Sequence, residues 1–174
     1  MKKYLLVFIF LLPASVHSEV DLSLRFGTGV SVLVNIPYKA SGDTPRFSIP
    51  LMLDVGLMID ERFGLYLEGV LLFTEGGGNG HIFGGVYGVL KGEYTFFKGD
   101  NLGFYALLGL GYGGVLMWGY EDLYGIGPGT LNFGAGIEFY VTDGLSLGFE
   151  PRLRWGFPRE VQTPSVELLL TIRV

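Results

Sequence analysis

Apolar residues alternate with polar or small ones along most of the chain. Between Val20 and Ile36 the even positions are apolar except for Thr28, beginning with Val20 and Leu22, while the odd positions include Asp21 and Ser23. Successive side chains of a β-strand point to opposite faces, so a period of two separates the residues onto two faces. The pattern therefore predicts a strand with one apolar face.

The same alternation recurs in seven further segments. The eight predicted strands cover Val20–Ile36, Phe47–Ile59, Phe63–Phe73, Ile82–Phe96, Leu102–Trp118, Leu131–Val141, Leu145–Phe157 and Val166–Val174. None of their apolar faces carries Asp, Glu, Lys or Arg. Beyond the first residues of the chain, glycine or a polar residue interrupts every apolar run before it reaches the roughly 20 residues of a membrane helix. We therefore expect an all-β protein.

Short and long connections alternate between these strands. The short ones, each with turn-forming residues, lie at 60–62, 98–101 and 142–144. The longer ones lie at 37–46, 74–81, 119–130 and 158–165. Outer-membrane barrels have short periplasmic turns and longer external loops. This asymmetry predicts an up-and-down barrel with both termini on the periplasmic side.

The apolar faces could point into a lipocalin-like barrel or outward into lipid. The opposite faces hold many glycines and few charges, which suits a narrow lumen better than water. They also hold the apolar residues Leu33, Val70, Leu72, Val89, Leu107, Val115 and Leu169. Aromatic residues gather near the strand ends as expected for two interfacial girdles: Phe63, Tyr94, Phe96, Phe104 and Phe139 at the turn ends, and Phe47, Phe73, Trp118, Trp155 and Phe157 at the loop ends. We therefore predict an eight-stranded antiparallel up-and-down transmembrane β-barrel.

Composition supports a membrane environment. Hydrophobic residues make up 49% of the chain and charged residues 17%, with 29 glycines, whereas soluble domains average roughly 25% charged residues and roughly 7% glycine. The net charge is −5, and removal of Lys2 and Lys3 with a leader would make it −7. Nucleic-acid binding favours the opposite sign, so no nucleic-acid partner is expected.

The N-terminal segment has the pattern of a secretory signal peptide. Lys2 and Lys3 precede a short apolar core from Tyr4 to Leu12, which is too short to cross a bilayer. We predict cleavage after Ser18, which gives a signal peptide over 1–18 and a barrel domain over 19–174. The chain has no cysteine, so neither a lipoprotein anchor nor a disulfide is available.

Charged residues fall on the inward faces of the predicted strands. An eight-stranded barrel is just wide enough for its own side chains to fill. Five cations and six anions point into it: Arg25, Lys91, Arg152, Arg154 and Arg173 against Asp54, Glu68, Glu93, Glu138, Glu150 and Glu167. Near balance suits a closed lumen, because an unpaired buried charge is costly. We interpret this lumen charge network as structural packing, with an ion gate as the alternative.

Catalytic, cofactor and metal sites find little support. Gly109-x-Gly111-x-x-Gly114 matches a dinucleotide fingerprint, but the strand alternation continues through it where a helix should begin. The mature chain has one histidine, His81, with Glu75 and Ser48 as the possible companions for acyl transfer or hydrolysis. No His, Cys, Asp or Glu cluster has metal-ligand spacing. We predict no catalytic residue, no cofactor and no metal.

The leader, the eight amphipathic strands and the alternating turns and loops resemble the OmpA-, OmpX- and OmpW-like outer-membrane barrels across the mature chain. The resemblance implies a location in the outer membrane of a double-membraned bacterium, contact with lipid and lipopolysaccharide, and insertion by the barrel-assembly machinery. One departure is the end Leu170–Val174, because these proteins usually end in an aromatic residue. We expect a monomeric, non-enzymatic barrel that serves envelope integrity or surface contacts. The alternatives are a lipid A-modifying enzyme and a narrow channel for ions or small apolar solutes.

Overall fold

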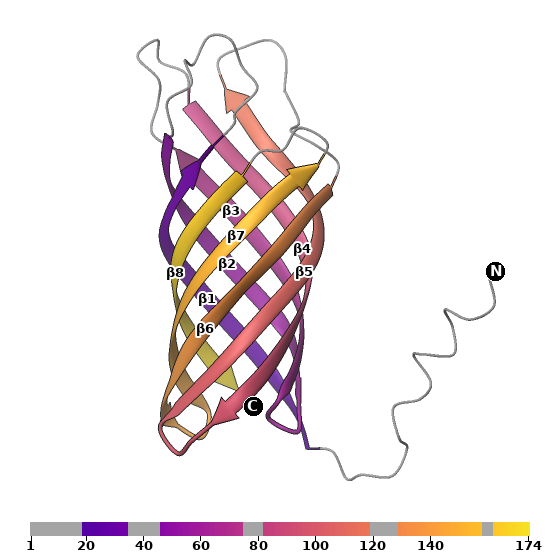
Figure 1. Ribbon diagram of the computed structural model, residues 1–174, viewed down its shortest axis with the longest axis vertical. Coiled ribbons are helices and arrows are strands. Elements are labelled where there is room, and N and C mark those ends of the chain that lie inside the picture. Colours follow the sequence, from indigo (N-terminus) through magenta and orange to yellow (C-terminus); the bar gives the residue numbers. More distant parts are fainter. Residues whose placement is uncertain (1–18, 35–45, 75–81, 119–128, 158–161) are drawn as a thin grey trace, which may run out of the picture.

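The computed structural model describes residues 19–34, 46–74, 82–118, 129–157 and 162–174, which form eight β-strands (Figure 1). The strands are β1 Val20–Leu33, β2 Arg46–Ile59, β3 Phe63–Thr74, β4 Ile82–Lys98, β5 Leu102–Trp118, β6 Gly129–Thr142, β7 Leu145–Phe157 and β8 Gln162–Arg173. The all-β prediction is confirmed, and all eight predicted strands are present. Within these ranges no helix is long and apolar enough to cross a membrane.

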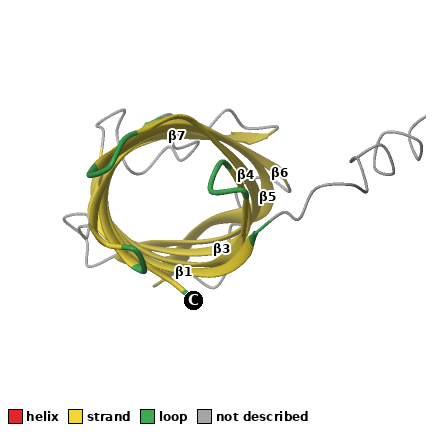
Figure 2. Ribbon diagram, turned by 90° about the horizontal axis from the view of Figure 1, so that it is seen from below, coloured by secondary structure: helices red, strands yellow, loops and turns green. Residues whose placement is uncertain are grey.

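The strands close into a barrel. Each strand pairs antiparallel with its neighbour in sequence, and β1 also pairs with β8, from Ser23 opposite Arg173 to Ser31 opposite Ser165. Seen along the axis, the strands form a complete ring (Figure 2). Every strand is therefore paired on both sides, as a barrel surrounded by hydrocarbon requires.

Two strand ends differ from the prediction for identifiable reasons. β8 begins at Gln162 instead of Val166, because Pro164 breaks the apolar alternation but lies on the exposed face. β4 continues past Phe96 to Lys98, because the ladder shifts by one residue between Thr95 and Phe97. Such a bulge interrupts the period of two. As a result Phe96 and Phe97 both lie on the outer surface.

The end of β1 and both ends of β6 also differ from the prediction. β1 ends at Leu33, with Val34 forming a single bridge to Gln162, and the predicted extension to Ile36 lies outside the described residues. β6 runs from Gly129 to Thr142, whereas the prediction was Leu131–Val141. At its C-terminal end the register shifts between Tyr140 and Thr142.

The short connections are tight turns, as predicted. In the β2–β3 turn, Asp60 and Glu61 have positive φ angles of 50° and 55°, and the Arg62 amide donates to the Ile59 carbonyl at 3.1 Å. Two successive positive φ values match the right-handed twist of a hairpin. In the β4–β5 turn, the Gly99 amide donates to the Leu102 carbonyl at 2.8 Å. Val20 pairs with Ile59, so the described chain begins at this short-turn end.

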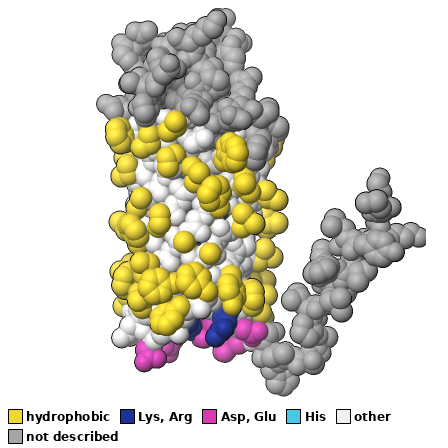
Figure 3. All heavy atoms as spheres, viewed as in Figure 1, with side chains coloured by type: hydrophobic (Ala, Val, Ile, Leu, Met, Phe, Trp, Pro, Cys, Tyr) yellow, Lys and Arg dark blue, Asp and Glu magenta, His cyan; other side chains and the backbone are white. Residues whose placement is uncertain are grey.

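The outer surface of the barrel is apolar. Among the described residues the outward positions are filled mainly by Leu, Val, Ile and Phe, and charged side chains gather at the short-turn end (Figure 3). Aromatic rings cluster there: the Phe63 and Tyr94 centroids are 4.9 Å apart and those of Phe97 and Phe104 5.6 Å apart. At the loop end Phe47 and Phe73 are exposed, whereas the side chains of Trp118 and Phe157 lie outside the described residues. The apolar faces therefore point outward, as predicted.

A substitution at Leu108 can test the outward orientation of the apolar faces. It is 60% exposed near the middle of β5, whereas its neighbour Leu107 is 5% exposed. Leu108→Arg should destabilise the barrel in a bilayer by roughly 2–4 kcal/mol, because it puts a charge into hydrocarbon. Heat-modifiable gel migration after insertion into vesicles measures the effect, with Leu108→Ala as the control. Unchanged insertion of the arginine variant would contradict the outward orientation of the apolar faces.

Candidate functional site

The barrel gathers the inward side chains of all eight strands into one narrow lumen. The ten residues of the predicted lumen charge network are all buried there: Arg25, Asp54, Glu68, Lys91, Glu93, Glu138, Glu150, Arg152, Arg154 and Glu167. Arg173, the further cation expected on the inner face, lies close to the short-turn end. The ion pairs divide these residues into a central cluster and two separate pairs.

Seven residues form what we call the central cluster: Asp54, Glu68, Lys91, Glu150, Arg152, Arg154 and Glu167. Asp54 and Glu68 lie directly opposite each other on β2 and β3. The Lys91 ammonium, from β4, contacts both carboxylates, with 3.2 Å between Nζ and Glu68 Oε2. Lys91 thus bridges two like charges that would otherwise repel each other.

Two arginines of β7 complete the central cluster. Arg152 contacts Glu68, donates from Nε to Glu150 Oε1 at 2.7 Å, and has Nε 3.4 Å from Glu167 Oε2. Arg154 Nη1 lies 2.6 Å from Glu167 Oε1, and its Nη2 lies 3.7 Å from Glu68 Oε1. The planar guanidinium presents several donors in fixed directions, so one arginine serves several carboxylates. The cluster therefore ties β2, β3, β4, β7 and β8 together.

The two separate pairs involve β1, β4, β6 and β8. Arg25 donates to both oxygens of Glu93, with 2.9 Å from Nη2 to Oε1. Arg173 Nη2 lies 2.6 Å from Glu138 Oε2. Paired and hydrogen-bonded charges of this kind are tolerated in a low-dielectric interior, whereas single ones are not.

Two tyrosines connect the Arg25 pair to the central cluster. The Tyr66 ring has the Arg25 guanidinium carbon 4.4 Å from its centroid and Lys91 Nζ at 5.2 Å. The Tyr105 hydroxyl donates to Glu150 Oε2 at 2.8 Å. A cation over an aromatic face is attracted by the ring quadrupole. These tyrosines were not predicted as part of the network, and their inward phase on β3 and β5 is the signal that identifies them.

An apolar cluster adjoins the central cluster. On β2, β3 and β4 the next inward position toward the loop end is apolar, namely Met52, Val70 and Val89. The whole apolar cluster comprises Leu33, Met52, Val70, Leu72, Tyr87, Val89 and Leu169. Its members, from β1, β2, β3, β4 and β8, fill part of the lumen beside the charges.

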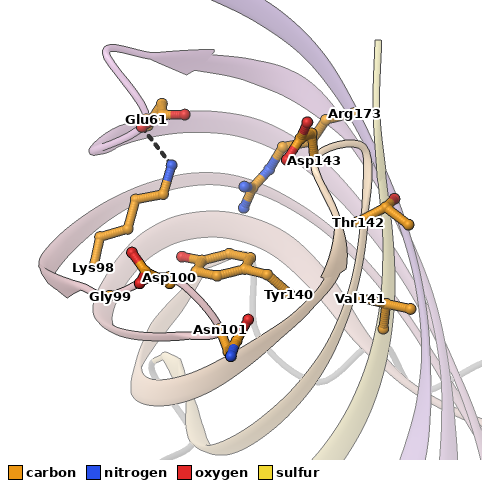
Figure 4. A pocket seen from close by; sticks show the side chains of 10 residues that line it. All are labelled: Glu61, Lys98, Gly99, Asp100, Asn101, Tyr140, Val141, Thr142, Asp143 and Arg173. Atoms are coloured by element: carbon orange, nitrogen blue, oxygen red, sulfur yellow. Dashed lines mark ion pairs between the residues drawn. The ribbon is translucent and has the colours of Figure 1, made fainter.

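A polar pocket of about 430 Å³ opens at the short-turn end (Figure 4). Tyr140 lies within it, with Lys98 Nζ 5.5 Å and the Arg173 guanidinium carbon 5.6 Å from its ring centroid. Lys98 forms an ion pair with Glu61 across the mouth. A Cβ at Gly103 would lie 2.2 Å from the Tyr140 hydroxyl oxygen, so glycine is needed for the ring to lie here.

Of the candidate catalytic residues, the structure describes only Ser48. Ser48 is 3% exposed, and its hydroxyl hydrogen-bonds to the hydroxyl of Ser31 inside the lumen. His81 and Glu75 lie outside the described residues. Over the described ranges no group of His, Cys, Asp and Glu side chains could hold a metal ion. The β5 strand runs through Gly109 and Gly111, which confirms that this glycine motif does not open a helix.

Solved structures share the fold at low sequence identity. The chain is similar to neisserial surface protein A (TM-score 0.67, 10% identity, 90% of this chain and 99% of that one). It is also similar to the attachment invasion locus protein Ail of Yersinia pestis (TM-score 0.57, 16% identity, 90% of this chain and 99% of that one). A third similar structure is the N-terminal β-barrel domain of Pseudomonas aeruginosa OprF (TM-score 0.58, 12% identity, 87% of this chain and 97% of that one). No family model and no curated protein matches the sequence. The fold is that of the small eight-stranded outer-membrane β-barrels.

Arg152 should be a large contributor to stability. Its removal leaves Glu68, Glu150 and Glu167 short of a buried partner, and breaking a buried ion pair costs roughly 3–5 kcal/mol. Arg152→Met should lower the free energy of unfolding by this amount in urea titrations from vesicles. Lys98→Met is the matched control, because its partly exposed pair with Glu61 contributes less than about 1 kcal/mol. Equal losses in the two variants would contradict the role of the lumen network.

Proposed function

We propose that the protein is a non-enzymatic, non-conducting outer-membrane barrel that holds its four loop segments on the outer surface, in the service of envelope integrity or surface contacts. The observation that carries the proposal is the filled lumen. Ion pairs of the central cluster cross it, and the apolar cluster lies directly beside them. A lumen packed in this way suits a rigid rod better than a pore.

The proposed location rests on the surface of the barrel and on the fold comparison. Exposed Leu, Val, Ile and Phe side chains surround the described strands, with aromatic rings clustered near the short-turn end. A contiguous apolar surface of this extent suits hydrocarbon, not water. The similar solved structures described above, neisserial surface protein A and the OprF domain among them, are outer-membrane β-barrels. In this placement the short turns and both termini are periplasmic, the barrel inserts through the assembly machinery, and it contacts lipid and lipopolysaccharide as a monomer.

The charge of the loop segments bears on possible ligands. Ail of Yersinia pestis has been solved with the heparin analogue sucrose octasulfate, which is strongly anionic. In this chain, residues 35–45, 75–81, 119–128 and 158–161 contain five acidic residues against two basic ones. Like charges repel, so we propose that the loops contact neutral or cationic surface groups and not sulfated polysaccharides.

Conductance measurements test the filled lumen. Purified protein in planar bilayers should give no current steps above background at any voltage, because ions would have to displace the paired charges of the central cluster. An open porin in the same bilayers is the positive control. Reproducible steps from the folded protein would instead support the narrow-channel alternative.

Lipid A analysis tests the non-enzymatic proposal. Mass spectrometry of lipid A from cells with and without the protein should give the same acyl pattern, because Ser48 faces the lumen and cannot reach an outer-leaflet substrate. A pattern that changes with the protein and reverts in His81→Ala would establish the lipid A-modifying alternative.

A further inference from the structure

Among the lumen side chains that the structure describes, the ion-paired charges do not balance, and the imbalance lies in the central cluster. Arg25 with Glu93 and Arg173 with Glu138 are neutral pairs. The central cluster has three cations, Lys91, Arg152 and Arg154, against four carboxylates, and each of its residues is at most 4% exposed. One uncompensated charge in a closed lumen is costly. The central cluster therefore needs one further positive charge.

Asp54 is the carboxylate with the weakest compensation. Glu68 contacts Lys91 and both arginines of β7. Glu150 has Arg152 and the Tyr105 hydroxyl, and Glu167 has both arginines and the Ser165 hydroxyl. Asp54 has only Lys91, which it shares with Glu68. Its Oδ1 is buried and has no hydrogen-bond partner among the described residues. Glu68 Oε1 and Glu167 Oε2 also lack a hydrogen bond, but each has an arginine nitrogen within 3.7 Å.

The cations around Asp54 are each engaged by another carboxylate. On β1, Arg25 lies directly opposite Asp54 in the ladder, but its guanidinium donates twice to Glu93. On β4, Lys91 is held by Glu68 as well, and Arg152 on β7 by Glu68 and Glu150. The neighbour of Asp54 on β3 is Glu68, a like charge. Asp54 thus carries the surplus negative charge of the central cluster.

We propose that the central cluster binds one proton, carried by Asp54 in the folded barrel at neutral pH. The proton cancels the surplus charge, because it leaves three cations against three carboxylates in the central cluster. A monovalent metal ion would supply the same charge. The proton fits better, because the Lys91 ammonium already occupies the position between the two carboxylates where a metal ion would sit.

Isotope-edited infrared spectroscopy tests the proposal directly. Protein labelled with ¹³C-carboxyl aspartate and folded in vesicles should show the C=O band of a protonated carboxyl at neutral pH. The band should disappear in Asp54→Asn and persist in Asp100→Asn, the matched control in the exposed β4–β5 turn. Absence of the band from the wild-type protein, or its survival in Asp54→Asn, would overturn the proposal.

The pH dependence of stability gives a second, independent readout. Above the ordinary aspartate range of about 3.9, the unfolded chain has lost this proton and the folded wild type retains it. Rising pH then increases the unfolding constant of the wild type about tenfold per pH unit relative to Asp54→Asn, until the proton leaves the folded state. The control is Asp100→Asn, for which the dependence of the unfolding constant on pH should run parallel to that of the wild type. A pH-independent difference between wild type and Asp54→Asn above that range would contradict a bound proton.

The same titration distinguishes a proton from a metal ion. Urea unfolding of the wild type should be equal in sodium, potassium and choline chloride at constant ionic strength. If sodium or potassium stabilises the wild type but not Asp54→Asn, a metal cation supplies the charge and the proton assignment is wrong.

Discussion

The rest of the structure depends on the need to satisfy charges inside a closed, narrow lumen. Once β1 pairs with β8, the inward side chains of all strands face one another, and the charged ones are buried. Charges placed there attract one another strongly, and unpaired ones are strongly destabilising. The network therefore links strands that are far apart in sequence. Arg152 on β7 meets Glu68 on β3, and Arg25 on β1 meets Glu93 on β4.

The same constraint organises the lumen along its length. On β2, β3 and β4 the apolar cluster begins one inward position beyond Asp54, Glu68 and Lys91, toward the loop end. On β8 the order is reversed, because Leu169 lies on the short-turn side of Glu167. Arg154 joins the two kinds of packing, because it contacts both Glu167 and the sulfur of Met52. Ionic and apolar packing together fill the barrel, and this continuity underlies the proposal of a rod that supports loops instead of a pore.

Period-two alternation predicts most of this fold, because every second side chain of a strand faces the same surroundings, either lipid or the lumen. The inward phase alone identifies Arg25, Asp54 and Lys91 as lumen residues. The bulge at Phe96 and the early start of β8 were not predicted, because both interrupt the alternation that marks a strand. The pairing partners were also not predicted. Which carboxylate meets Arg152 depends on strand tilt and register, which no local pattern encodes.

The most direct test of the account is the environment of Leu107 and Leu108, two adjacent residues that should face opposite sides of β5. Methyl NMR of the folded protein in lipid nanodiscs can measure contacts from each side chain to the lipid acyl chains. We expect strong lipid contacts for Leu108. Leu107 should have none and should contact only other lumen side chains. Lipid contacts at Leu107 with none at Leu108 would contradict a barrel with an apolar exterior and a charged, filled lumen.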